Sequence, residues 1–296
     1  MKLPVIITIC FTLITGVNLY AQKTWTGTTS TAWNTSTNWS PAGAPAATDH
    51  VTIPSAPSNQ PVISGSLTPV CNNLTINTGA SLTISSTITN QAMLTASGNA
   101  IINGSLSLTG VASTTLKVVN ITWGSGSSMT GSISGGIHVS GNWEFASGSS
   151  VAMGLSSVVF TGSTNTLITS NSASSSFNVV TFGKSSGNTV SINAASTAGL
   201  RFGSTINISG GNQLLCPANI TVIMAGNLVN AGNFSFSNGT VSLERSSGTQ
   251  SIEVNTGDVF YNLNINTGGT ATINNSLTVM KDLTIQAGTF DPQNNN

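Results

Sequence analysis

The stretch N-L-T-I-N-T-G-A-S-L-T-I, residues 73–84, decides how this chain folds. Its Leu and Ile residues alternate with Thr, which is the two-residue period of a strand with one buried face. Between the two apolar bursts stands Asn77-Thr78-Gly79, and Asn and Gly tolerate the positive φ that tight turns require. The stretch therefore predicts two short strands that meet at a corner.

The same unit recurs along the chain. The segment N-L-N-I-N-T-G at residues 262–268 nearly repeats residues 73–79. In a longer match, Phe177 and Phe260 stand at equivalent places about 83 residues apart, which is several coils if each coil takes roughly 20 to 25 residues. Repeats of this kind stack, and each buries its apolar residues against its neighbours.

These features predict an all-β fold, a right-handed parallel β-helix. About 11 to 13 coils at ~4.8 Å each would form a rod on the order of 50 to 60 Å long. Leu, Ile, Val and Phe would face inward, Thr, Ser and Asn outward, and Asn side chains at the corners would hydrogen-bond along the rod. The alternative is two antiparallel β-sandwich domains, which would have longer strands and no coil-sized repeat.

The composition excludes several classes of function. Among 296 residues there are 7 Lys plus Arg and 7 Asp plus Glu, and charged residues make up 5% of the chain. No basic surface is available for phosphate contacts, so we expect no nucleic-acid partner. Hydrophobic residues make up 39% and the mean hydropathy is +0.21, which excludes disorder driven by charge.

The first 21 residues predict a secretory signal peptide. Lys2 supplies the positive start, residues 5–17 form the apolar stretch, and small Ala21 stands at the cleavage position. An uncleaved membrane anchor is the alternative, but the stretch is shorter than the roughly 20 residues needed to span a bilayer. No later segment is apolar for long enough to cross a membrane. We therefore expect a secreted chain. Cys71 and Cys216 are far apart in the sequence, and an elongated fold would keep them apart in space, so we expect both to be buried, unpaired thiols.

The segment after the signal peptide resembles the start of Bacteroidetes-type secreted surface proteins with β-helical, adhesin-like repeats. The motifs that carry the resemblance are W-T-G at 25–27, N-W-S at 38–40, V-T-I-P at 51–54 and the repeat at 73–84. The resemblance implies type IX secretion and display at the cell surface. We expect a Trp-rich cap at 22–60 and a β-helical region at 61–296. Such proteins usually end in a sorting domain, so we expect that this chain is truncated at its C-terminus.

Tryptophans are the candidate glycan contacts. Trp25, Trp33 and Trp39 lie close together in the sequence, and Trp143 is a fourth candidate. Aromatic rings on a surface can form a platform for sugar rings. For the first three we favour another role, which is to cover the open end of the rod, because a solenoid needs a cap over its apolar columns.

No catalytic, cofactor or metal site is predicted. Glu144 is the most interesting carboxylate, and His138 could lie beside it on an adjacent turn. Glycosidic cleavage needs paired carboxyl groups about 5 to 9.5 Å apart, whereas the other acidic residues are scattered towards the C-terminal end. Asp49 is expected to make a loop hydrogen bond, and no spacing matches a zinc or calcium motif.

The sequence thus predicts a secreted or cell-surface structural and adhesive rod, not an enzyme. Its neutral polar surface would make weak, multivalent contacts with glycans, cells or matrix. The alternative is a β-helical polysaccharide-degrading enzyme that uses Glu144. Ice binding is a third hypothesis, but the Thr, Ser and Asn residues do not form regular rows.

Overall fold

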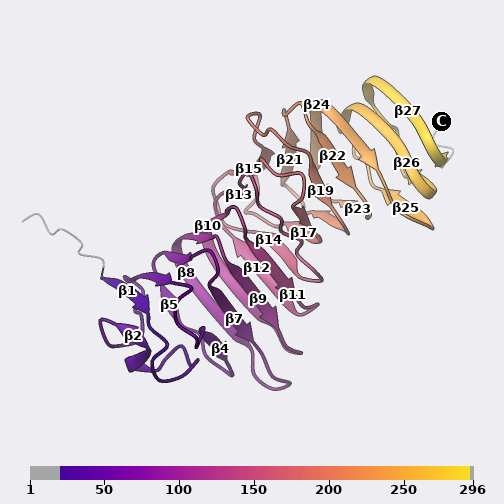
Figure 1. Cartoon of the computed structure of the whole chain (residues 1–296). Helices are drawn as coiled ribbons and strands as arrows, with labels where there is room; N and C mark the ends of the chain where they lie inside the picture. Colours follow the sequence, from indigo (N-terminus) through magenta and orange to yellow (C-terminus); the bar gives the residue numbers. More distant parts are fainter. Residues whose placement is uncertain (1–20, 294–296) are drawn as a thin grey trace, which may run out of the picture.

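The computed structural model describes residues 21–293, and they form an elongated parallel β-helix of about 11 turns (Figure 1). The prediction of a parallel β-helix is confirmed, and the antiparallel sandwich alternative is wrong. The signal peptide predicted at 1–21 lies, except for Ala21, outside the described residues. In the described part of the chain, no helix is long and apolar enough to cross a membrane.

Each turn of the helix contributes to three walls, which follow one another along the chain. The first wall contains β5 (Val70–Cys71), the first half of β8 (Ala92–Ile102), the first half of β10 (Thr114–Trp123), β12 (Gly135–Val139), β14 (Ser157–Phe160), β17 (Val179–Phe182), β20 (Ile206–Ile208), β23 (Leu228–Asn230) and β25 (Thr249–Ile252). The second wall contains β1 (Gln22–Trp25), β3 (His50–Ile53), β6 (Leu74–Ile76), the second halves of β8 and β10, β13 (Trp143–Phe145), β15 (Thr166–Ser170), β18 (Thr189–Ile192) and β21 (Gln213–Cys216). The third wall contains β4 (Val62–Ser64), β7 (Ser81–Ser85), β9 (Ser105–Thr109), β11 (Ser128–Gly131), β16 (Ser176–Phe177), β19 (Leu200–Phe202) and β22 (Thr221–Met224).

Three long strands turn the corners without a break near the C-terminal end. They are β24 (Asn233–Leu243), β26 (Val259–Ile273) and β27 (Val279–Asp291). At the other end, a 3-10 turn η1 (Ser36–Asn38) leads into β2 (Trp39–Ser40), which pairs with β1. This is the one antiparallel pair among residues 21–293.

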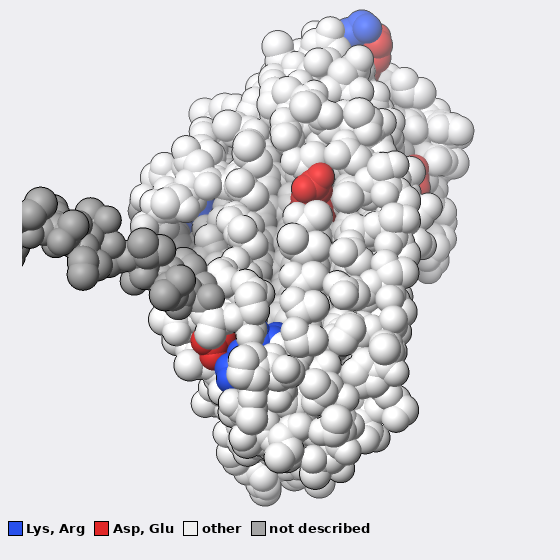
Figure 2. Space-filling view, turned by 60° about the vertical axis from the view of Figure 1, so that its left-hand side comes forward, with Lys and Arg blue, Asp and Glu red and all other residues white. Residues whose placement is uncertain are grey.

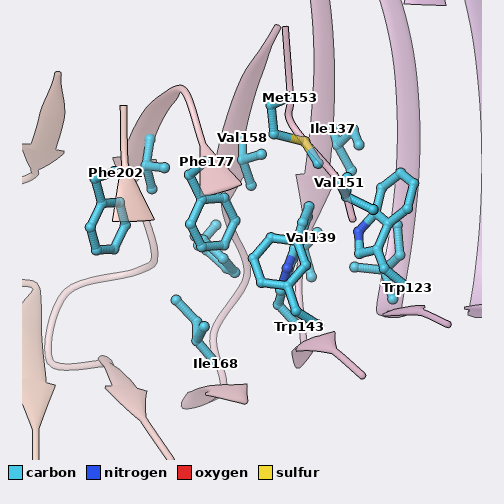
Figure 3. Packing of buried hydrophobic residues seen from close by; sticks show 14 of the residues in the cluster. Trp123, Ile137, Val139, Trp143, Val151, Met153, Val158, Ile168, Phe177 and Phe202 are labelled. Carbon is cyan, nitrogen blue, oxygen red and sulfur yellow. The ribbon is translucent and has the colours of Figure 1, made fainter. Parts of the chain in front are cut away.

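The core consists of columns in which residues of successive turns lie directly above one another. Inward positions of the first wall form one such column: Leu94, Leu116, Ile137, Val158, Val180, Ile206 and Leu228. In the middle of the rod the core is aromatic, because the ring of Trp143 lies 4.9 Å from that of Phe177, which stacks on Phe202 at 5.4 Å (Figure 3). The alternation of buried and exposed residues follows the strand period, and this gives each turn its inner and outer surface.

An asparagine ladder, consisting of Asn73, Asn99, Asn120 and Asn142, joins successive turns at the corner between the first and second walls. The Nδ2 of Asn120 donates to Asn99 Oδ1 at 2.8 Å, and Asn120 Oδ1 accepts from the backbone N of Asn142 at 2.7 Å. Gly141 makes room for this ladder, because a Cβ there would lie 2.3 Å from Asn120 Oδ1. The predicted hydrogen bonding of corner asparagines is confirmed.

The predicted equivalence of Phe177 and Phe260 is wrong. Phe177 lies in the third wall, and the pairings of successive turns lead from it through Phe202 to Ile265. Phe260 instead pairs with Phe236, in the column that descends to Trp143 in the second wall. The two similar segments are therefore displaced by one wall.

The two ends of the rod differ. At the N-terminal end, Trp25, Trp33 and Trp39 are all buried. At the C-terminal end β27 pairs only with β26, and its Leu283 and Ile285 are 46% and 55% exposed. Both leucine and isoleucine are aligned with buried residues of the preceding turn, so they occupy inward positions that nothing in the described chain covers.

Candidate functional site

The four tryptophans predicted as glycan contacts do not face solvent. Trp25 and Trp143 are 0% exposed, Trp33 is 1% exposed and Trp39 is 3% exposed. A sugar ring that packs on an indole needs a free ring face. The burial therefore contradicts the prediction that these side chains contact glycans.

The first three tryptophans form one cluster at the N-terminal end. The ring of Trp39 packs edge-to-face against Trp25 at 5.0 Å and against Trp33 at 4.8 Å. The Nε1 of Trp39 donates to the carbonyl of Trp33, and that of Trp25 donates to the carbonyl of Asn59, each at 2.6 Å. These contacts bury all three indoles together at the N-terminal end of the rod, where we expect the cap.

His138 and Glu144 lie on the same turn, not on adjacent turns. His138 is on β12 in the first wall and Glu144 is on β13 in the second wall. The corner of Ser140, Gly141 and Asn142, which takes part in the asparagine ladder, separates them. The prediction that they lie on adjacent turns is wrong, and each side chain belongs to a different outer surface.

Glu144 lies in a shallow hollow of about 360 Å³ on the second wall, called here the Glu144 groove. The carboxylate stands in an outward column between Thr122 and Thr169 of the neighbouring turns. Its Oε2 accepts a hydrogen bond from Thr122 Oγ1 at 3.4 Å, while Oε1 has no partner among the described residues. Carboxylate oxygens each accept two hydrogen bonds, so most of the capacity of Glu144 remains free for a ligand.

Amide and apolar groups surround this carboxylate. Asn120 and Asn142 of the asparagine ladder form one side of the groove. Ile101 and Leu167 also line it, and their side chains are 43% and 44% exposed. The groove thus combines hydrogen-bonding groups with exposed apolar surface, the mixture that binding sites for small polar ligands use.

The other carboxylates mostly have structural roles. Glu244 forms an ion pair with Arg201 at 3.3 Å, and the buried Asp258 accepts hydrogen bonds from several neighbours. Asp49 accepts from the backbone N of Ala46 at 2.9 Å, which confirms the predicted loop hydrogen bond. Within residues 21–293 no three His, Cys, Asp or Glu side chains gather in a way that could hold a metal ion.

Cys71 and Cys216 are buried free thiols, as predicted. Burial, assisted by the charge of Asp49, raises the pKa of Cys71 to about 12. Burial also raises the pKa of Cys216 to about 11, although a hydrogen bond with the backbone of Ala218 acts in the opposite direction. Both thiols are therefore protonated and inaccessible in the folded chain.

We expect neither thiol of the folded protein to react with a disulfide reagent such as DTNB at about pH 8. Attack requires the thiolate, and the raised pKa of Cys71 alone reduces the thiolate fraction by about 10³-fold. Both should react rapidly once guanidinium unfolds the chain, which serves as the control. Rapid labelling of the native protein at Cys71 or Cys216 would contradict the packing described above.

One comparison with known proteins matches part of the chain. Residues 24–124 match the profile of a family described as a domain of unknown function, DUF8693. This segment runs from the tryptophan cluster to the end of β10. No curated protein and no solved structure matches the chain.

Sequence reasoning identified Glu144 but missed the residues that shape its groove. Ile101 and Leu167 each stand beside a buried apolar residue, Ile102 and Ile168. Adjacent apolar residues leave open which of the two faces outward. The only available signal was the alternation in W-E-F at 143–145, which places Glu144 on the opposite face of the strand from Trp143 and Phe145.

Proposed function

We propose that this chain is a secreted or cell-surface rod that makes weak, multivalent contacts with glycans. The predicted signal peptide and the resemblance to surface proteins support a location outside the cell. The observation that carries the binding proposal is the Glu144 groove, in which a carboxylate with free acceptor capacity lies beside exposed Ile101 and Leu167.

The chemistry of the groove suits a neutral saccharide. Sugar hydroxyls are donors, and the carboxylate of Glu144 and the amide oxygens are acceptors. Hydrogen bonds to a charged acceptor are about twice as strong as neutral ones. The C–H face of a sugar ring would pack against Ile101 and Leu167, which gain from being removed from water.

The low charge of the chain, in which charged residues make up 5%, also supports the proposal of weak contacts. The face of the rod shown in Figure 2 is almost entirely free of Lys, Arg, Asp and Glu, with only a few separate charged groups. Repetition of weak sites along a rigid rod raises the overall affinity without any single strong contact. This suits adhesion, in which many contacts act together.

The alternative of a polysaccharide-degrading enzyme gains no support from the groove. Glu144 is the one carboxylate among the described residues that line it. Hydrolysis by a pair of carboxyl groups needs a second acid within about 5 to 9.5 Å.

The proposal is tested in two steps. A glycan array shows which neutral oligosaccharides residues 22–296 bind, and titration with those oligosaccharides then gives the affinities. Replacing Glu144→Gln keeps the shape of the side chain and removes its charge, so we expect affinity to fall about five- to tenfold. The matched control is Asp282→Asn at the far end of the rod, where the Asp side chain is 66% exposed. We expect the control to bind as tightly as the parent.

Two results would contradict the proposal. One is an array on which no neutral glycan binds the folded chain. The other is equal binding by the parent and Glu144→Gln, which would place any glycan contact outside the groove.

A further inference from the structure

A second hollow, of about 490 Å³, lies on the first wall, on the other side of the asparagine ladder from the Glu144 groove. We call it the Lys117 hollow. Lys117 and His138 are paired neighbours on adjacent turns, and Thr95 continues the same outward column on the turn before. Ser140 and Thr161 lie at its corner side.

The cationic group of this hollow has no partner in the described structure. Every other Lys and Arg of residues 21–293 has a hydrogen bond or an ion pair, whereas Lys117 has neither. The imidazole of His138 also makes no hydrogen bond, and it lies over Gly136, where a Cβ would come within 3.9 Å of its Cδ2 and Nε2. Two groups able to carry positive charge therefore stand side by side.

A third positive charge lies behind the corner of the hollow. Lys184 is 5% exposed, and its Nζ donates to the backbone carbonyls of Ser140 and Thr161 at 3.1 Å and 2.5 Å. Both of these residues line the hollow. No Asp or Glu lines it, so the positive potential is not neutralised by the protein itself.

We propose that the Lys117 hollow binds the carboxylate of an acidic saccharide, a uronate unit, through Lys117 and His138. The hydroxyls of Thr95 and Ser140 make no hydrogen bond in the described structure and face the same hollow, so they are available for sugar hydroxyls. The partly exposed Val119 and the buried Ala96 also line the hollow and are apolar. This site goes beyond the Glu144 groove and does not require it.

The geometry favours a saccharide over a peptide. An extended peptide binds a β-sheet through an unpaired strand edge. The strands beneath the hollow, β10 and β12, are each paired on both sides within the first wall. A ligand here must be held by side chains alone, and a compact sugar with one carboxylate and several hydroxyls matches the groups present.

The site should also respond to pH. Burial, and then the charge of Lys117, lowers the pKa of His138 below its ordinary value of 6.5. The charged groups near His138 are Lys117 on β10 and Lys184 at the corner, and β14 contributes none. A bound carboxylate would favour the protonated imidazole, so by linkage the binding should tighten as the pH falls through the pKa of His138.

The test compares a galacturonate trisaccharide with a galactose trisaccharide by calorimetric titration of residues 22–296. At about pH 5.5 we expect the acidic sugar to bind at least about tenfold tighter than the neutral one. Lys117→Gln should weaken uronate binding about tenfold, whereas Lys281→Gln, an exposed lysine at the far end, should not. His138→Gln should remove the pH dependence between about pH 7.5 and about pH 5.5.

A second measurement follows the imidazole itself. In NMR titrations, the pKa of His138 should rise when the uronate saturates the site, and the signal that disappears in His138→Gln identifies it. Equal binding of the two trisaccharides, or uronate affinity unchanged by Lys117→Gln in a variant with unchanged thermal unfolding, would overturn the proposal. So would a tripeptide that binds as tightly as the uronate.

The two sites can fail separately. Glu144→Gln should leave uronate binding at the Lys117 hollow unchanged. Loss of uronate binding in Glu144→Gln would overturn the assignment of the acidic sugar to the first wall.

Discussion

Trp143→Ala is expected to lower the free energy of unfolding by about 3–5 kcal/mol. The indole is 0% exposed and lies 4.9 Å from the ring of Phe177, 5.4 Å from Phe145 and 5.9 Å from Trp123. Alanine would leave a cavity in the middle of the aromatic core shown in Figure 3. Each turn is stabilised only by its neighbours. A cavity in the middle of the rod therefore weakens the contacts of the turns on both sides of it.

The measurement is denaturant unfolding followed by circular dichroism, together with amide exchange of the turns on either side of β13. Trp143→Phe is the graded control: it keeps a ring and removes an indole Nε1–H that has no hydrogen-bond partner among the described residues. We expect it to cost clearly less than the alanine variant. A truncation of exposed Leu167 to alanine, one turn away, should have little effect. Equal stabilities for Trp143→Ala and Leu167→Ala would contradict the packing.

The short strands were predictable because their alternation is local. Residues 73–84 form β6, a corner in which Gly79 has a φ of 79°, and β7, as the pattern predicts. The corner asparagines were predictable for the same reason, since stacked turns place like residues above one another. Local pattern therefore sufficed for the fold class.

The register between distant turns was not predictable. Aligned residues of neighbouring turns are 22 positions apart at Ile121 and Trp143 but 26 positions apart at Val180 and Ile206. Turns of unequal length shift the repeat from one wall to the next, which is why Phe177 and Phe260 look equivalent but lie in different walls. The partners of Glu144 and Lys117 depend on this register, so the sequence could not bring together the residues of either hollow.

The role of the tryptophans shows a second limit. The alternation in W-E-F at 143–145 fixes which side chains share a face, but not which face lies inward. That choice follows from the aligned neighbours, since Trp143 pairs with Ile121 and Ile168, both buried. Leu167 faces outward for the same reason, because Ile168 takes the inward place above Trp143.

Asp258→Ala is expected to lower the free energy of unfolding by about 3 kcal/mol or more, although sequence reasoning placed this residue among scattered acids. Asp258 is 2% exposed, and its Oδ2 accepts from Asn230 Nδ2 at 2.6 Å and from the backbone N of Asn255 at 2.7 Å. Its Oδ1 accepts from the backbone N of Phe234 at 2.7 Å. A hydrogen bond to a charged group contributes about 1.5–3 kcal/mol, and a buried donor left unpaired adds a further penalty.

The carboxylate therefore joins two turns near the C-terminal end. Asn230 and Phe234 belong to the turn before Asp258, on β23 and β24, whereas Asn255 begins the loop that carries Asp258 into β26. Amide exchange should show loss of protection in β24 and β26 in the variant, while β8 and β10 stay protected, because a repeat protein transmits a defect mainly to its neighbours. Asp282→Ala is the matched control, since its exposed pair with Lys281 at 3.8 Å should contribute less than about 1 kcal/mol. If the two alanine variants unfold at the same denaturant concentration, then the buried carboxylate is not what holds these turns together.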